Sequence, residues 1–185
     1  MTVVSLSESD VRALLSYEQL IPAMANALIE FSSGKVVQPV RQMLPVEAEQ
    51  RYLGIMPTVT PTAMGAKLVC FYPKNAGTRH HTHQASIALF DPEFGLPLAF
   101  MDGRLITEMR TAATSAAVTK QVANSDSKVL ALIGSGVQAK AHLEALSTIY
   151  NFDEVRIWSR TASNAQSFAQ KHGAIAMEAQ AAVDG

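Results

Sequence analysis

The chain has 185 residues, of which 48% are hydrophobic and 17% are charged, and its formal net charge is -1. This composition is too apolar for an intrinsically disordered chain and too neutral for a nucleic-acid-binding surface, which requires a basic face. No apolar run approaches the roughly 20 residues that cross a bilayer, and the N terminus lacks the pattern of a signal peptide. Cys70 is the single cysteine, which excludes an internal disulfide. We therefore expect a protein of the reducing cytoplasm.

The first 34 residues are predicted to be helical. Ser7 and Asp10 have the spacing of a capping box. Pro22 is expected in the first turn of the next helix, where proline is tolerated, and Gly34 is expected to end that helix. After Tyr17, apolar residues at helical spacing predict one buried stripe, formed by Leu20, Met24, Leu28 and Phe31.

The middle of the chain is predicted to form strands and then one long helix. Short apolar runs separated by prolines predict strands at 40–46, 52–56 and 65–71. Two further runs, at 85–90 and 96–101, flank a loop with turn residues at both ends and predict a hairpin. Residues 105–123 are mostly Ala, Ser and Thr, so we expect a helix that is buried or touches a ligand.

The polar segment 124–127 is the expected domain boundary, which divides the chain into residues 1–124 and 125–185. Beyond it, strand and helix patterns alternate. This order predicts parallel strands joined by crossover helices. The predicted elements are a strand at 128–133, a helix at 138–150, a strand at 154–158, a helix at 161–172 and a strand at 174–177.

A glycine motif follows the first of these strands. The apolar segment 129–133 runs into Gly-x-Gly-x-x-Ala, formed by Gly134, Gly136 and Ala139. The first glycine permits a tight turn, the second lets the backbone approach a pyrophosphate, and the small alanine keeps the helix near the strand. A strand before the motif and a helix after it favour a dinucleotide site. The alternative is a tight turn without a ligand.

The end of the second strand bears on which dinucleotide binds. An NAD site usually places Asp or Glu there, whereas segment 157–161 reads Ile-Trp-Ser-Arg-Thr. Arg160 and two hydroxyls can bind a 2′-phosphate. A hydrogen bond to a charged group contributes roughly 1.5–3 kcal/mol, or about a ten- to hundredfold preference. The motif therefore favours NADPH over NADH, and the alternative is a solvated Arg160 that starts a helix.

Three cations with apolar neighbours are candidates for substrate binding. They are Arg41, Lys67 and Arg110. A basic side chain is costly to bury unless an anion pairs with it, so convergence of two or three of them would create a carboxylate site. Arginine suits bidentate carboxylate binding, and lysine can also deliver a proton. The alternative is that each lies at an edge with its charge in water.

Other reactive side chains carry weaker signals. His80, His81 and His83 lie close together, but this segment lacks the nearby Cys or carboxylate ligand that a metal site needs. We therefore expect solvated loop histidines, with His83 possible at the cofactor, and no metal site. Cys70 lies between Val69 and Phe71 and is expected to be a buried, inert thiol.

Several motifs occur in an order that resembles a known family. They are QPVR at 38–41, KLV at 67–69, HQA at 83–85, MDG at 101–103, RTAATSA at 110–116 and GSGVQA at 134–139. Together they resemble the ornithine cyclodeaminase/mu-crystallin family over about residues 1–185, and segments 31–34 and 154–158 are most similar to its mu-crystallin branch of NADPH-dependent ketimine reductases. The resemblance implies an α/β fold in which an α+β substrate-binding and dimerisation domain precedes a Rossmann-type NADP-binding domain.

The resemblance also implies residue roles and a reaction. The reaction is hydride transfer from NADPH to the C=N carbon of a cyclic imino acid, such as pyrroline- or piperideine-2-carboxylate, in a homodimer. Arg41, Lys67 and Arg110 would hold the substrate carboxylate, with Lys67 near the imine. The cofactor would be bound by Thr82, His83 and Arg110 at the nicotinamide, Gly134, Gly136, Val137 and Gln138 at the pyrophosphate, and Ser159, Arg160, Thr161 and Asn164 at the 2′-phosphate.

Members of this family continue well past residue 185, so we expect the chain to contain only the first half of the Rossmann-type domain. Strand 130–133 would otherwise be an open apolar edge. Two alternative functions stay open. One is an ornithine cyclodeaminase that releases ammonia and recycles bound NAD, and the other is a non-enzymatic binder of NADPH or a small ligand.

Overall fold

The computed structural model of the chain describes residues 2–47 and 51–184. The chain divides into two compact units. The first comprises Met1–Ser16 and Asn26–Thr107, and the second comprises Tyr17–Ala25 and Glu108–Gly185. The division falls inside helices α2 (Tyr17–Ser32) and α3 (Arg104–Val122), whereas the sequence predicts a domain boundary after residue 124, which stays a prediction.

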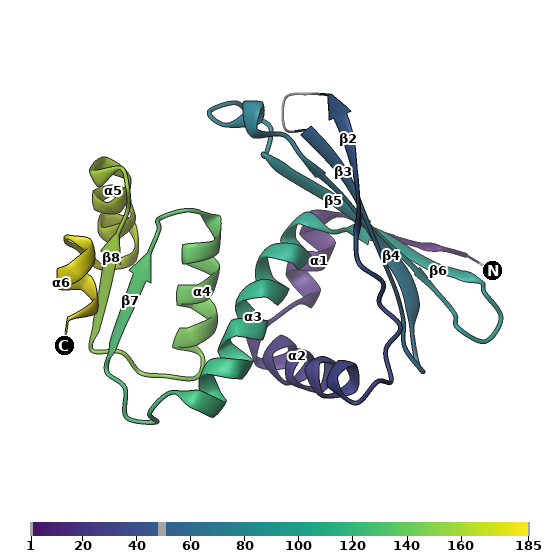
Figure 1. Ribbon diagram of the computed structural model, residues 1–185, viewed down its shortest axis with the longest axis horizontal. Coiled ribbons are helices and arrows are strands. Elements are labelled where there is room, and N and C mark those ends of the chain that lie inside the picture. The colour runs from purple at the N-terminus through teal and green to yellow at the C-terminus, as the bar shows by residue number, and fades with distance from the viewer. Residues whose placement is uncertain (1, 48–50, 185) are drawn as a thin grey trace. The chain divides into compact units, whose positions relative to one another are not determined.

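The first unit contains a six-stranded sheet in the order β1-β6-β5-β4-β3-β2 (Figure 1). β1 is parallel to β6, and the other neighbours are antiparallel. The predicted strands of this region are confirmed, whereas β1 was not predicted. The strands are β1 (Val4–Leu6), β2 (Gln42–Glu47), β3 (Arg51–Val59), β4 (Met64–Phe71), β5 (His83–Phe90) and β6 (Pro97–Asp102), and a 3-10 turn covers Pro73–Asn75.

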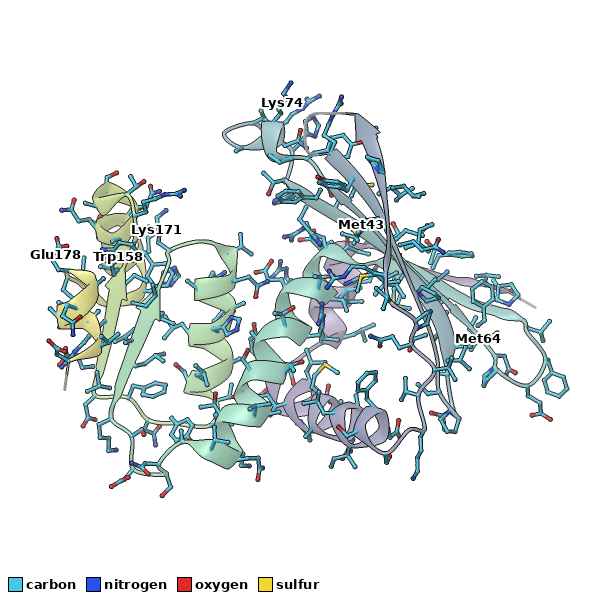
Figure 2. The ribbon with its side chains drawn as sticks, in the orientation of Figure 1. Met43, Met64, Lys74, Trp158, Lys171 and Glu178 are labelled. Carbon is cyan, nitrogen blue, oxygen red and sulfur yellow. The ribbon has the colours of Figure 1, made fainter. Side chains whose placement is uncertain are left out.

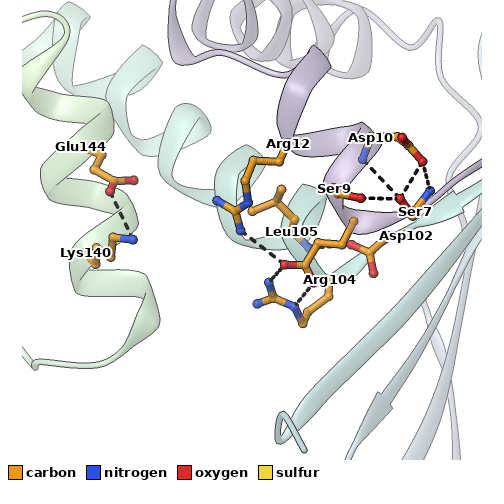
Figure 3. Close-up of polar contacts among 10 residues, drawn as sticks. Ser7, Ser9, Asp10, Arg12, Asp102, Arg104, Leu105, Lys140 and Glu144 are labelled. Carbon is orange, nitrogen blue, oxygen red and sulfur yellow. Dashed lines mark hydrogen bonds and ion pairs between the residues drawn. The ribbon is translucent and has the colours of Figure 1, made fainter.

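Two local signals of the first unit are confirmed. Helix α1 (Glu8–Leu14) begins with the predicted capping box, in which Ser7 Oγ accepts from the Asp10 amide at 3.3 Å and Asp10 Oδ2 accepts from the Ser7 amide at 2.8 Å (Figure 3). The predicted β5–β6 hairpin turns at Asp91, whose Oδ1 accepts from the amides of Glu93 and Phe94 at 2.8 Å each. Side chains therefore satisfy backbone donors at both places.

An ion pair connects α1 to the start of α3. Arg104 Nε donates to Glu8 Oε2 at 2.7 Å, a second guanidinium nitrogen contacts Glu8 Oε1, and Arg12 lies 3.3 Å from the same carboxylate (Figure 3). The Arg104 side chain is 11% exposed and the Glu8 side chain is 37% exposed. The hydrogen bond from Arg104 lowers the pKa of Glu8, against the opposing effect of burial.

The second unit contains a parallel sheet in the order β7-β8-β9. Helices follow each strand, so the predicted alternation is confirmed, with the short α6 as an addition. Its elements are β7 (Val129–Ile133), α4 (Val137–Ser147), β8 (Glu154–Trp158), α5 (Ala162–His172), β9 (Ile175–Ala176) and α6 (Ala179–Val183). Parallel strands with crossover helices confirm the predicted α/β class.

Small side chains form much of the core of the second unit. Tyr17 and Ile21 pack with the buried alanines Ala112, Ala113, Ala116, Ala117, Ala141 and Ala145. This confirms that the small-residue helix is buried. A second cluster joins Leu132, Ile157 and Phe168, which packs α5 onto the parallel sheet. Among the described residues, no helix is long and apolar enough to span a membrane.

Helix α2 differs from its prediction at three positions. Pro22 lies inside the helix rather than in its first turn. Leu28 and Phe31 are 38% and 52% exposed, so the predicted buried stripe is wrong beyond Met24. The reason is that periodicity identifies an apolar face but not the element that covers it. Gly34 does end the helix, with a φ of +74°.

The Glu8–Arg104 pair predicts a stability difference that depends on pH. Because the folded pKa of Glu8 is lowered, its stabilisation is present above about pH 4.3 and is lost as the pH falls through the folded pKa. Glu8→Gln should lower the free energy of unfolding at neutral pH by roughly 0.5–1 kcal/mol, since the carboxylate is partly exposed. Urea denaturation followed by circular dichroism measures it, with Glu93→Gln in the exposed hairpin loop as control. An equal loss at pH 3 would contradict this assignment.

Candidate functional site

The glycine turn between β7 and α4 combines a special backbone conformation with open space. Gly134 has a φ of +116°, which L side chains rarely adopt, and its amide donates to the Trp158 carbonyl at 2.7 Å. A Cβ at Gly136, the N-cap of α4, would meet no atom within 4 Å. Within the described chain, no side chain caps this helix. The turn can therefore admit a group beside the first amides of α4.

A side-chain hydrogen bond joins this turn to the loop that follows β8. Ser135 Oγ donates to Ser159 Oγ at 2.9 Å, and both residues are half-buried. The next residue, Arg160, is exposed, and Thr161 is the N-cap of α5. Because β7 and β8 are parallel neighbours, the loops at their carboxyl ends meet at one edge of the sheet.

The helix α4 that begins at this edge is fastened to α3. His142 contacts the Gln138 carbonyl at 2.7 Å through Nδ1 and Ser115 Oγ at 2.9 Å through Nε2. Val137 and Gln138, the predicted pyrophosphate residues, lie exposed in the first turn of α4. The bond to Ser115 therefore links α4 to α3, while the bond to the Gln138 carbonyl lies within α4 and orients the imidazole.

One hollow of about 400 Å³ extends from the glycine turn along α5. It contains the predicted residue Asn164 and two lysines, Lys140 and Lys171. Its lining residues are Ser135, Gly136, Val137, Lys140, Asn164, Ser167, Phe168, Lys171 and His172.

A second hollow of about 470 Å³ contains Arg160. Its lining includes Trp158, Ser159, Met177 and Glu178, which follows β9. Figure 2 labels Trp158 and Glu178 in the second unit. The end of β8 has no carboxylate in its own sequence. In the folded chain, however, the carboxylate of Glu178 lines the hollow that contains Arg160. A carboxylate there opposes the binding of an anion.

Lys67 is one of the three cations that the sequence predicts for substrate binding. It lies half-buried on β4, and its Nζ donates to Thr107 Oγ1 at 3.4 Å. The Thr107 hydroxyl in turn donates to the Gly103 carbonyl at 2.7 Å. The ammonium is therefore held by a hydroxyl whose own position the first turn of α3 fixes.

The other two cations have different surroundings. Arg41 is exposed, beside a Val40 that is 92% exposed, so the predicted apolar setting is wrong for this residue. It precedes β2 instead of lying within it. Arg110 lies half-buried on α3, in the second unit, whereas Lys67 belongs to the first. Convergence of these cations on one carboxylate stays a prediction.

The histidine segment leads into β5. His80 and His81 are exposed, as expected, while Thr82 and His83 are half-buried at the start of the strand, where the Thr82 carbonyl accepts from the Tyr72 amide at 2.7 Å. Among the described residues, no group of three His, Cys, Asp or Glu side chains could hold a metal ion. Cys70 is half-buried rather than fully buried.

Three residues of these sites were not identified from the sequence. Ser135 lies between the two glycines of the motif, so its hydroxyl could have been predicted to lie at the glycine turn. No local sequence signal indicates Thr107 or Glu178. Thr107 accepts a hydrogen bond from Lys67, which lies far away in the sequence, and Glu178 shares a hollow with Arg160, which follows a different strand. Both depend on how strands pair, which no local pattern specifies.

The βαβαβ order, the parallel sheet and the glycine turn define the second unit as a Rossmann-type fold. The first unit is an α+β sheet unit. The chain belongs to the Ornithine cyclodeaminase/mu-crystallin family, whose sequence profile matches residues 1–185.

Relatives in this family are similar in both sequence and structure. Ketimine reductase mu-crystallin from Macropus fuliginosus is 46% identical over 170 residues, which are 89% of this chain and 54% of that protein. Δ1-pyrroline-2-carboxylate reductase from Thermococcus litoralis, solved with NADH and L-proline, superposes with a TM-score of 0.88 at 34% identity over 97% of this chain and 58% of that one. An archaeal alanine dehydrogenase dimer with bound NAD gives a TM-score of 0.89 at 30% identity, covering 98% and 58%.

The chain spans about half the length of the curated relatives it matches. The described residues therefore correspond to one part of the relatives' folds.

The two glycines of the turn predict different responses to the same substitution. Gly134→Ala should lower the free energy of unfolding by about 1–3 kcal/mol, because alanine strains at a φ of +116°. Gly136→Ala is the matched control, with a φ of -83° and open space around the new methyl group, and should change it by less than about 0.5 kcal/mol. Urea denaturation of both variants measures the difference. Equal losses of unfolding free energy in the two variants would contradict the expectation that a side chain strains the backbone at residue 134.

Proposed function

We propose that the protein reduces cyclic ketimine carboxylates of the pyrroline-2-carboxylate and piperideine-2-carboxylate type with NADPH, by hydride transfer to the C=N carbon. The observation that carries this proposal is the open glycine turn, joined by the Ser135–Ser159 hydrogen bond to a strand end that has Arg160 and no carboxylate. Similarity to ketimine reductase mu-crystallin and to a pyrroline-2-carboxylate reductase supports the reaction.

The residues of the turn fit a dinucleotide. The open space at Gly136 and the uncapped N terminus of α4, among the described residues, suit a pyrophosphate, because the amides of the first turn and the helix dipole favour an anion. Gly134, Gly136, Val137 and Gln138 would hold it. A Cβ at Gly136 would occupy the space that the phosphate needs.

The choice of NADPH rests on the end of β8. Ser159, Arg160, Thr161 and Asn164 would bind the 2′-phosphate, since hydroxyls, an amide and a guanidinium can all donate to it. Glu178 opposes this choice from the hollow of Arg160. The similar structures hold NADH and NAD. NADH is therefore the competing coenzyme to measure.

The substrate carboxylate would be bound by Arg41, Lys67 and Arg110, with Thr82, His83 and Arg110 bordering the nicotinamide. The coenzyme supplies the hydride when it is bound. Addition to the C=N carbon leaves an electron pair on the ring nitrogen, and the Lys67 ammonium can donate the proton that nitrogen takes up. Thr107 holds Nζ of Lys67 in position for this role. Orientation by the cations and their field would supply much of the acceleration.

Two other functions within the family make distinct predictions. An ornithine cyclodeaminase releases ammonia and forms proline from ornithine without added reductant, because it recycles bound NAD. A non-enzymatic binder holds NADPH or a small ligand and turns over no imine. The Arg160 strand end disfavours the first, and the held ammonium of Lys67 disfavours the second.

NADPH oxidation by the intact protein across a panel of cyclic imino acids tests the proposal. We expect turnover with a five- or six-membered ketimine carboxylate, which absorbance at the reduced nicotinamide band follows. Lys67→Met should lower kcat/KM by at least about a hundredfold, while the Kd for NADPH stays within about twofold. Lys35→Met, an exposed lysine of the same unit, is the control.

The possible outcomes separate the candidate functions. Ammonia and proline from ornithine alone would establish the cyclodeaminase instead. NADPH binding without oxidation by any imine would establish the binder.

We also propose that the protein is a homodimer formed through the six-stranded sheet. Lys67 and the α3 turn that binds it lie on one face of the sheet, and the neighbouring Leu68 points to the opposite face. Leu44, Leu68 and Phe100 share that opposite face by register and are 47%, 46% and 50% exposed. An exposed apolar face of this kind favours burial against a second copy.

A charge on this face should prevent association. Leu68→Glu is expected to convert the dimer to a monomer, because association would bury an unpaired carboxylate. Analytical ultracentrifugation of the intact protein measures the mass. Phe94→Glu, at an exposed loop position, is the control and should stay dimeric. A wild-type monomer, or a Leu68→Glu dimer of unchanged affinity, would exclude this face as the interface.

A further inference from the structure

The hollow along α4 and α5 has a charge pattern that the 2′-phosphate residues above do not explain. Lys140 and Lys171 both line it, and Asp and Glu are absent from its described lining residues. It also contains Ser135 and Asn164, so it begins where the loops of β7 and β8 meet. The hollow of Arg160, by contrast, contains Glu178. Of the two hollows, the first has the more uniformly cationic lining.

Ser135 determines what the Ser159 hydroxyl can do. Ser135 Oγ donates its proton to Ser159 Oγ at 2.9 Å. Ser159 therefore has one of its two acceptor lone pairs occupied, and its own proton is available for a donated hydrogen bond. A ribose hydroxyl and a phosphate oxygen can both accept this hydrogen bond, but the phosphate oxygen is charged, so the bond that Ser159 donates to it is the stronger one.

Lys140 supplies charge from the hollow that also contains Ser135 and Asn164. It lies one helical turn after Gly136, which is about 6 Å along the axis of α4. Its Nζ lies 3.5 Å from Glu144 Oε1, and the two side chains are 47% and 48% exposed (Figure 3). An exposed pair of this kind is weak, so the ammonium can turn from Glu144 toward an anion in the hollow. Lys171 lies seven residues beyond Asn164 on α5 and adds a weaker field.

We propose that Ser135 and Lys140 are specificity-determining residues for the phosphorylated coenzyme, with Ser135 positioning the Ser159 hydroxyl as a donor to the 2′-phosphate and Lys140 supplying charge from the α4–α5 hollow. This inference rests on the function proposed above. Glu144 restrains Lys140, so the preference for NADPH depends on a balance between two side chains of one helix. Ser135 acts through Ser159 and is a positioning residue.

The test compares Kd values for NADPH and NADH, measured on the intact protein by titration of the reduced-nicotinamide fluorescence. Ser135→Ala should raise the Kd for NADPH about three- to tenfold and change that for NADH less than about twofold. Lys140→Met should raise the Kd for NADPH by a similar factor and that for NADH by a smaller one, because Lys140 lies one helical turn from Gly136, where the pyrophosphate of both coenzymes would bind. Ser135→Thr and Lys140→Arg should retain most of the preference, because they keep the hydroxyl and the charge. Lys140→Met should also reduce the salt dependence of NADPH binding.

Glu144→Gln provides a test of opposite sign. It frees Lys140 and removes a negative charge, so it should lower the Kd for NADPH about two- to threefold and that for NADH by a smaller factor. Ser147→Ala, on the same helix outside the hollow, and Lys120→Met, on α3, are matched controls that should change neither Kd. An unchanged circular dichroism spectrum of each variant shows that the fold is intact.

The failures of the two proposals differ. A wild-type protein that binds neither coenzyme overturns the proposed function. A wild-type protein that prefers NADPH, with Ser135→Ala and Lys140→Met variants that keep the same NADPH-to-NADH ratio, overturns this inference alone.

Discussion

The Gly134 amide donates to the Trp158 carbonyl at 2.7 Å, and this bond ties the end of β7 to the end of β8. It requires the backbone to turn immediately after β7, which the φ of +116° at Gly134 achieves and a residue with a side chain would resist. With the turn in place, α4 starts beside the next strand, and Ser135 comes within 2.9 Å of Ser159. The proposed coenzyme contacts at the pyrophosphate depend on this geometry, and so does the Ser159 contact with the 2′-phosphate.

Elements with strong local signals were predictable. The capping box at Ser7 and Asp10, the hairpin turn at Asp91 and strand β8 follow the sequence patterns closely, because each depends on neighbours a few residues apart. The small-residue helix α3 was predicted to be buried on composition alone, and its alanines are indeed in the core. In the capping box and the hairpin turn, one segment satisfies its own backbone groups, whereas the small side chains of α3 are buried by residues of α2 and α4.

Features that depend on distant partners were not predictable. Strand β1 is three residues long and exists through parallel pairing with β6, nearly a hundred residues away. Leu28 continues the periodic face of α2, yet the part of that helix beyond Ala25 belongs to a different unit from its start. At the site, Thr107 and Glu178 reach Lys67 and the hollow of Arg160 through strand pairing and helix placement. A residue type at a fixed spacing says nothing about such contacts.

The difference between local patterns and distant contacts also applies to the coenzyme preference, which Arg160 alone does not determine. Arg160 at the end of β8 favours a phosphate when only its own strand is considered. In the folded chain, Glu178 lines the same hollow as Arg160. Lys140 and Lys171 line the other hollow, which also contains Ser135 and Asn164. Phosphate preference is a difference between binding free energies, so charges of both signs near the site contribute to it. The local motif therefore identifies where a dinucleotide would bind, whereas the net field of Lys140, Lys171, Arg160, Glu144 and Glu178 would determine which one.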